Sequence, residues 1–205
     1  MNFLKAQRQI QIGRISTSET EIIDIIKAWG AISIAFAIVL RSQLQSNFYL
    51  SFMIASLTVG VGFLLHELGH KITAQKYGCF AEFRSFDNML LIAIAMSFFG
   101  FIFAAPGAVM IAGRVNKNKN GKISAAGPIV NLALALIFFA MLFLQLPKFL
   151  AAAAHYGFII NSWLALFNMI PFWLFDGYKV LKWNKLAYGS IVATAVALML
   201  MRSLI

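Results

Sequence analysis

Apolar runs long enough to cross a lipid bilayer recur along this chain of 205 residues. Hydrophobic residues make up 61% of the sequence, a share that a water-soluble domain of this size could not bury. A segment that crosses a bilayer must satisfy its backbone hydrogen bonds internally, and a helix does so. We therefore expect an all-α polytopic membrane protein with about five transmembrane helices, or six. The expected spans are 22–40, 48–65, 125–146, 158–175 and 186–205.

The segment before the first span, residues 1–17, has no apolar core and no small-residue cleavage site. It is therefore not expected to be a removable signal peptide. Ser18 and Glu21 have the spacing of a capping box, which predicts that a helix begins there. We expect residues 1–17 to be an N-terminal segment on the inner side of the membrane, and residues 18–205 to form a single membrane-embedded domain.

Residues 89–112 are mostly apolar and could form a sixth span, but basic residues flank them on both sides. The flanking basic residues are Lys71, Lys76, Arg84, Arg114, Lys117, Lys119 and Lys122. A single crossing would place one of the two groups on the outer side, against the usual charge bias. Gly100, Pro106 and Gly107 also interrupt a helix. We favour a small re-entrant β-hairpin, or another membrane-associated β element, over a sixth crossing.

The net charge of +10 could suggest a nucleic-acid partner, but the basic residues lie between apolar spans. This distribution is typical of topology signals rather than of a phosphate-binding face. With the N-terminus inside, all but three of the 17 basic residues lie on the inner side; the exceptions are Arg41, Lys148 and Arg202. The sequence thus predicts a multi-pass protein in contact with lipid. Its single cysteine and lack of appended domains suit a prokaryotic cytoplasmic membrane.

The five residues HELGH at 66–70 follow directly on the second apolar run. On a helix, His66 and His70 share a face and can direct ring nitrogens at one metal ion, while Glu67 can reach a water on that ion. Ionisable groups in a membrane are costly without such a role. The alternative interpretation is a helix end whose charges pair among themselves. The remaining histidine, His155, has no neighbour at ligand spacing, and we expect it in an outer loop.

Two histidines do not complete a catalytic zinc site, which usually has three protein ligands. Asp176 is the best candidate for the third ligand, because it ends the expected span 158–175 at the same inner depth as HELGH. Glu82 and Asp87, in an inner loop, are weaker candidates. Alternatively, Asp176 and Gly177 only stop a helix, with Gly177 in the left-handed conformation.

With HELGH at 66–70 and NMIPFWLFDG at 168–177, the sequence resembles the site-2 protease family of intramembrane zinc metalloproteases. The first stretch has the form H-E-x-x-H, and the second has the family's form N-x-x-P-x-x-x-x-D-G. A third stretch, AGPIVN at 126–131, is similar to the family's G-P-x-x-N. The resemblance covers about 48–185, the expected catalytic core.

The resemblance implies that His66, His70 and Asp176 bind one catalytic Zn²⁺ and that Glu67 is the general base. It also implies that Asn168 lies near the active site, where it helps to hold the substrate or the oxyanion; interhelical hydrogen bonding is the alternative. For Asn131 we favour a structural role: the helix begins at Gly127 and Pro128, and Asn131 ties it to a neighbouring helix.

The expected function is hydrolysis of a peptide bond in or near the transmembrane segment of a membrane-protein substrate, with the active site near the cytoplasmic side. The β element within 89–112 could hold the unwound substrate by strand addition. Two other classes of protein remain as alternatives. A zinc carrier would need acidic residues along a path across the membrane, and the sequence has none. A non-catalytic scaffold would have no need of Glu67.

Overall fold

The computed structural model describes residues 9–13, 15–102 and 105–202. The helices are α1 (Glu19–Leu44), α2 (Phe48–Ala55), the π-helical η1 (Ser56–Gly60), α3 (Val61–Lys76), α4 (Asp87–Ser97), α5 (Lys117–Met141), α6 (Lys148–Asn168), α7 (Asp176–Trp183) and α8 (Lys185–Met201). The strands are β1 (Gln9–Ile12), β2 (Ile15–Ser18), β3 (Phe80–Ser85) and β4 (Gly107–Ala112). They form two antiparallel sheets of two strands each. The expected fold class, an all-α polytopic membrane protein with a small β element, is confirmed.

Four helical segments of the described chain have the length and hydropathy needed to cross a bilayer. They are Glu19–Leu44, Phe48–Lys76, Lys117–Met141 and Lys148–Asn168. The second has 29 residues and combines α2, η1 and α3, so the HELGH stretch continues the second span as a helix. The apolar helix α8 has 17 residues, at the lower limit for a crossing, and α4 has 11, too few to cross alone.

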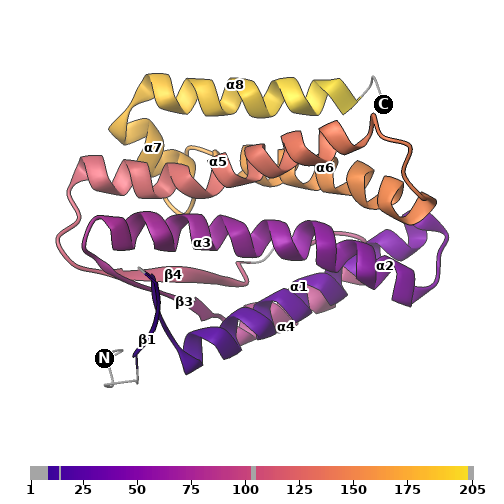
Figure 1. Ribbon diagram of the computed structural model, residues 1–205, viewed down its shortest axis with the longest axis horizontal. Helices are drawn as coiled ribbons and strands as arrows, with labels where there is room; N and C mark the ends of the chain where they lie inside the picture. Colours follow the sequence, from indigo (N-terminus) through magenta and orange to yellow (C-terminus); the bar gives the residue numbers. More distant parts are fainter. Residues whose placement is uncertain (1–8, 14, 103–104, 203–205) are drawn as a thin grey trace.

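Helix α3 occupies the centre of the molecule (Figure 1). It packs along α5 on one side and against the β3–β4 sheet on another. Helix α1, with α4 packed on it, lies on the same side as this sheet, and α8 packs on α6 and α7 at the opposite side. The residues of α3 therefore lie between α5 and the β3–β4 sheet.

The first transmembrane helix begins where the sequence predicts. The hydroxyl of Ser18 accepts a hydrogen bond from the backbone N–H of Glu21 (3.2 Å), and α1 starts at Glu19. This bond satisfies one of the free amides in the first turn of the helix. The strands β1 and β2, which directly precede α1, were not expected from the sequence.

The expected hairpin within 89–112 is wrong in its position, although the β element itself is present. Residues 87–97 form α4, and only Gly107–Ala112 form a strand, β4. The partner strand β3 lies upstream, in a register that runs from Phe80↔Ala112 to Ser85↔Gly107. The Met, Leu and Ala residues of α4 favour a helix, which ends before Gly100, a residue in the left-handed conformation (φ 84°). β4 then forms its backbone hydrogen bonds with β3, the strand that precedes α4 in the sequence.

The third span begins earlier than expected, at Lys117 instead of Ala125. The side chain of Asn116 accepts from the backbone N–H of Lys119 (2.9 Å) and caps the helix. Gly127 and Pro128 therefore lie inside α5 rather than at its start. The predicted start is wrong because the capping asparagine outweighs the polar composition of the first two turns.

The fourth span is displaced toward the N-terminus relative to the prediction of 158–175. α6 runs from Lys148 to Asn168, and α7 begins at Asp176 after a loop. The cause is Pro171, whose ring disfavours helical backbone at the preceding residue and ends the helix. Asp176 thus starts a short helix and does not end a span. His155 lies within α6, half-buried, so its expected loop position is also wrong.

Candidate metal centre

Three residues of α3 have potential metal-ligand atoms that lie close to one another. His66, Glu67 and His70 each offer one nitrogen or oxygen, and all of these atoms lie within 4.8 Å of one another. Both histidines are buried, with 5% and 8% of their surface exposed. Their Nε2 atoms are 3.0 Å apart, because residues four apart on a helix share a face.

Asp176 approaches the same two imidazoles from a different element. Its Oδ2 atom lies 3.4 Å from His66 Nε2 and 3.0 Å from His70 Nε2. Helix α7 can begin this close to the end of α6 because residue 177 is glycine: a Cβ there would lie 2.7 Å from the Cα of Met169 and still closer to its carbonyl. Gly177 is not in the left-handed conformation, so its role is close packing and not the left-handed helix stop considered above.

The other nitrogen of each imidazole is held by an oxygen acceptor. His70 Nδ1 donates to the backbone carbonyl of Ile123 (2.7 Å), which can only accept. His66 Nδ1 donates to Asn131 Oδ1 (2.6 Å), since the amide nitrogen of Asn131 is used for Gly62 and Asn161. With the proton of each neutral ring on Nδ1, both Nε2 atoms present a lone pair. Three acceptor atoms then face each other, an arrangement that a cation satisfies.

The space beside these three atoms fits a zinc ion. The separations of 3.0, 3.0 and 3.4 Å are close to the ~3.3 Å edge of a tetrahedron with metal–ligand bonds of ~2.0–2.1 Å. Gly127 of α5 faces the pair of histidines, and a Cβ at this position would lie 2.5 Å from His70 Nε2 and 2.6 Å from His66 Nε2. The missing side chain keeps this position free, and the donor set of two imidazoles and one carboxylate is one that zinc prefers.

Glu67 points to a different neighbour, the β3–β4 sheet. Its half-buried side chain interacts with the backbone of Val109 in β4. The carboxylate therefore lies between the histidine pair and this strand. A group in that position can exchange protons with a molecule bound along β4 and beside the imidazoles.

Asn168, the last residue of α6, donates from Nδ2 to the carbonyl of Leu164 one turn earlier (2.9 Å). This bond lies within its own helix and is not interhelical. The loop that follows it leads directly to Asp176.

The two weaker candidates for the third ligand have other partners. Glu82 pairs with Arg84 of the same strand and accepts from Gln9 Nε2 (2.9 Å). Asp87 pairs with Lys27 of α1 (2.8 Å), and this hydrogen bond lowers the pKa of the Asp87 carboxyl. Neither carboxylate belongs to the His66, Glu67 and His70 group.

Three residues that shape the centre were not predicted in these roles: Ile123, Gly127 and Asn131. The stretch AGPIVN predicted Asn131 as a tie between helices, which its bonds to Gly62 of α3 and Asn161 of α6 confirm, but it predicted Gly127 only as the start of a helix. Because α5 begins earlier, these residues lie inside the helix, level with the histidines. A backbone acceptor such as the Ile123 carbonyl cannot be recognised from the sequence, because every residue has a backbone carbonyl.

One similar protein of known sequence was found, from the archaeon Methanocaldococcus jannaschii, and it bears the name "Putative zinc metalloprotease MJ0611". The two sequences are 40% identical over 187 residues, which cover 89% of this chain and 94% of the relative. No protein-family model and no solved structure matches the chain. The four bilayer-length apolar helices make this chain a membrane protein, and at this identity and coverage it belongs to the same zinc metalloprotease family as the archaeal protein.

Proposed function

We propose that this chain is an intramembrane protease of the site-2 type, which hydrolyses a peptide bond in or near the transmembrane segment of another membrane protein. The observation that carries the proposal is the approach of Asp176 to within 3.4 Å of both imidazoles of HELGH. Two sequence stretches more than 100 residues apart thus supply the donors of one metal site, with Glu67 beside it.

In this proposal, His66, His70 and Asp176 hold the catalytic zinc. When bound, zinc polarises the scissile carbonyl and makes the attacking water more acidic. Glu67 accepts the proton of the attacking water and delivers it to the amine that leaves. Asn131 and the Ile123 carbonyl hold the imidazoles in the tautomer that leaves each Nε2 free. Asn168 helps to hold the substrate or the oxyanion, a role for which its Nδ2 would turn away from Leu164.

The substrate is proposed to bind as an extended strand along β4. A transmembrane helix hides its peptide bonds in its own hydrogen bonds, so it must unwind before it is cut. Among the described residues, β4 pairs only with β3, and its other edge can accept an added strand. The interaction of the Val109 backbone with Glu67, the proposed general base, supports binding of the substrate along this edge.

The active site is proposed to face the cytoplasmic side of a prokaryotic membrane. HELGH lies in the second half of the span Phe48–Lys76, toward Lys76 and the inner loop, and α5 and α7 begin at the same end of the molecule as Lys76 (Figure 1). This end carries most of the basic residues, including Lys117, Lys119 and Lys122. The usual excess of Lys and Arg on the inner side supports this orientation.

Co-expression of the chain with candidate single-span membrane proteins tests the proposal. The native chain should shorten at least one of them, and Glu67→Gln should lower the cleavage rate by about 10²–10⁴-fold, the usual contribution of a general base. Zinc content should be unchanged, because Glu67 is not one of the proposed ligands. A Glu67→Gln variant with full activity would refute the assignment.

The same assay tests Asn168 and the two other classes of protein. Asn168→Ala should keep zinc and cut more slowly; an unchanged rate would remove it from the active site. A scaffold would cut none of the candidates in either form. A carrier would move zinc into sealed vesicles, which the protease should not do.

A further inference from the structure

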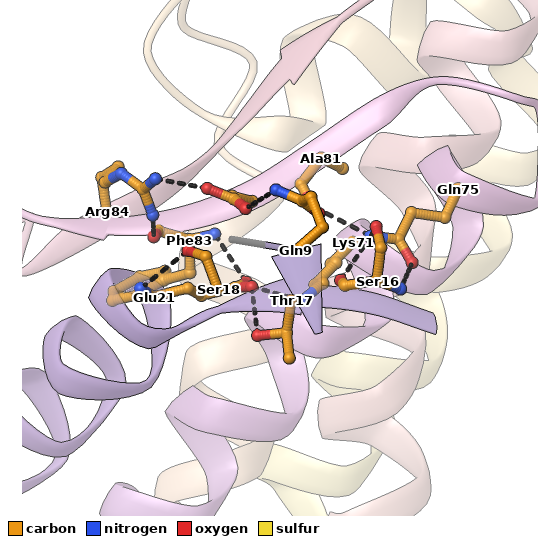
Figure 2. A network of polar contacts seen from close by, with 11 residues as sticks. Gln9, Ser16, Thr17, Ser18, Glu21, Lys71, Gln75, Ala81, Phe83 and Arg84 are labelled. Atoms are coloured by element: carbon orange, nitrogen blue, oxygen red, sulfur yellow. Dashed lines mark hydrogen bonds and ion pairs between the residues drawn. The ribbon is translucent and has the colours of Figure 1, made fainter. Parts of the chain in front are cut away.

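A buried ion pair joins α1 to α3 just beyond the metal centre. Lys71 Nζ lies 2.5 Å from Glu21 Oε2, and the two residues are 2% and 0% exposed. The hydroxyl of Thr17 donates to the same oxygen (2.7 Å) (Figure 2). Removing two charges from water is costly, and such a pair is only weak evidence of a gain in stability. Its presence calls for another explanation.

The second oxygen of this carboxylate binds the sheet. Glu21 Oε1 accepts from the backbone N–H of Phe83 in β3 (2.8 Å). One buried carboxylate thus contacts α3 through Lys71 and β3 through Phe83, as Figure 2 shows. The distance between α3 and the β3–β4 sheet therefore depends on the side chain of Glu21.

These contacts complete a closed ring that includes the general base. Lys71 follows Glu67 by one helical turn, so both side chains lie on the same face of α3. Phe83 is the register partner of Val109, and the Val109 backbone interacts with Glu67. The ring runs from Glu67 through Lys71, Glu21, Phe83 and Val109 back to Glu67. Glu67, Lys71, Glu21 and Phe83 line one cavity of about 10 Å³, at most the size of one water, so these four side chains lie close together.

The direction of the Phe83 amide also indicates which edge of β4 is free. In a regular antiparallel pair, two register partners direct their N–H groups either both toward each other or both away. Phe83 directs its N–H to Glu21 and away from β4. Its partner Val109 then directs its own N–H away from β3, toward the open edge and Glu67. This is the edge along which a substrate strand would pair.

We propose that Glu21 and Lys71 are positioning residues whose ion pair holds the β3–β4 sheet against α3, so that the open edge of β4 stays beside Glu67. Neither residue contacts the metal ligands' Nε2 or Oδ2 atoms or the substrate edge itself. The inference rests on the proposed function for its purpose, because the position of β4 matters only if a substrate binds there.

Hydrogen exchange of the β4 amides, residues 107–112, tests this role in the purified, zinc-loaded protein in lipid nanodiscs. The test variant is Glu21→Gln with Lys71→Met, which removes both charges together but keeps an oxygen that can accept from the Phe83 amide. A neutral pair of similar volume commonly preserves stability. The control is Arg84→Gln, which removes an ion pair of β3 that does not reach α3.

The double variant should keep its melting temperature and zinc content, while its β4 amides exchange about tenfold faster, a typical coupling between groups in contact. The Arg84→Gln control should exchange like the native protein. Native exchange in the double variant, or equal acceleration in the control, would overturn the positioning role. If the double variant does not fold, a second neutral pair, Glu21→Gln with Lys71→Gln, carries the same two outcomes. Absence of zinc from the native protein would instead refute the proposed function, and the exchange rates would then be compared in the zinc-free proteins with the same two outcomes.

Discussion

At the scale of single residues, the candidate metal centre depends on a glycine that leaves space as well as on the side chains that could bind the ion. The two imidazoles and the Asp176 carboxylate meet beside Gly127, where any side chain would enter the space next to both Nε2 atoms. The Asn131 side chain and the Ile123 carbonyl accept hydrogen bonds from the Nδ1 atoms of the two rings and so fix their orientation. The H-E-x-x-H spacing alone predicted the pair on one helical face, since helical geometry fixes it. The groups that orient the rings come from α5, and no local pattern around HELGH could reveal them.

Gly127→Ala tests this part of the account. The added methyl group would lie 2.5–2.6 Å from both Nε2 atoms, so the rings must move apart. We expect the zinc affinity to fall by about 100-fold, at the upper end of the effects seen when the surroundings of metal ligands are disturbed. Competition with a zinc chelator of known affinity measures the change.

Gly189→Ala is the matched control, because a Cβ at that position in α8 meets no atom within 4 Å. It should bind zinc like the native chain. Equal affinity of the Gly127→Ala variant would show that zinc does not bind between these two nitrogens.

At the scale of helices and strands, the sequence predicted the existence of the spans more accurately than their first and last residues. The capping box at Ser18 marked the start of α1 correctly. The third and fourth spans lie nearer the N-terminus than the composition predicts, because Asn116 caps the start of α5 and Pro171 ends α6. The pairing of β3 with β4 could not be read from the sequence at all, since α4 separates the two strands and register partners are up to 32 residues apart.

Ile111→Pro tests whether the open edge of β4 binds the substrate. The register gives Ile111 the same amide direction as Val109, and the substitution leaves the Val109 amide on Glu67 intact. Proline removes the N–H group that points away from β3 and is tolerated at the edge of a sheet. Cleavage of the membrane substrate should fall about tenfold or more, because a strand added to β4 would lose a main-chain hydrogen bond, while the zinc content stays at the native level. Initial rates of cleavage in detergent or vesicles measure the effect.

Ile111→Ala serves for comparison, since it shortens the side chain but keeps the N–H group. If both variants cut equally well, the substrate does not pair with this edge at Ile111.

At the scale of the whole molecule, the fold brings the inner ends of several elements to one place. The middle of α3, the first half of α5 and the start of α7 meet around the candidate metal centre, and the β3–β4 sheet closes its other side. The distribution of basic residues predicted that these ends share one side of the membrane. It could not predict contact between them. That contact depends on close packing at residues such as Gly177, where α7 begins against the backbone of Met169.

The most direct test of the central claim is the zinc content of purified variants, measured by atomic emission against protein concentration. The native chain should hold one zinc ion, and Asp176→Ala should lose most of it, as should His70→Ala. Lys179→Met, which removes the cation 3.8 Å from Asp176 Oδ1 but no proposed ligand, should retain it. An Asp176→Ala variant that keeps one tightly bound zinc would contradict the claim that the two distant stretches of the chain bind a single ion together.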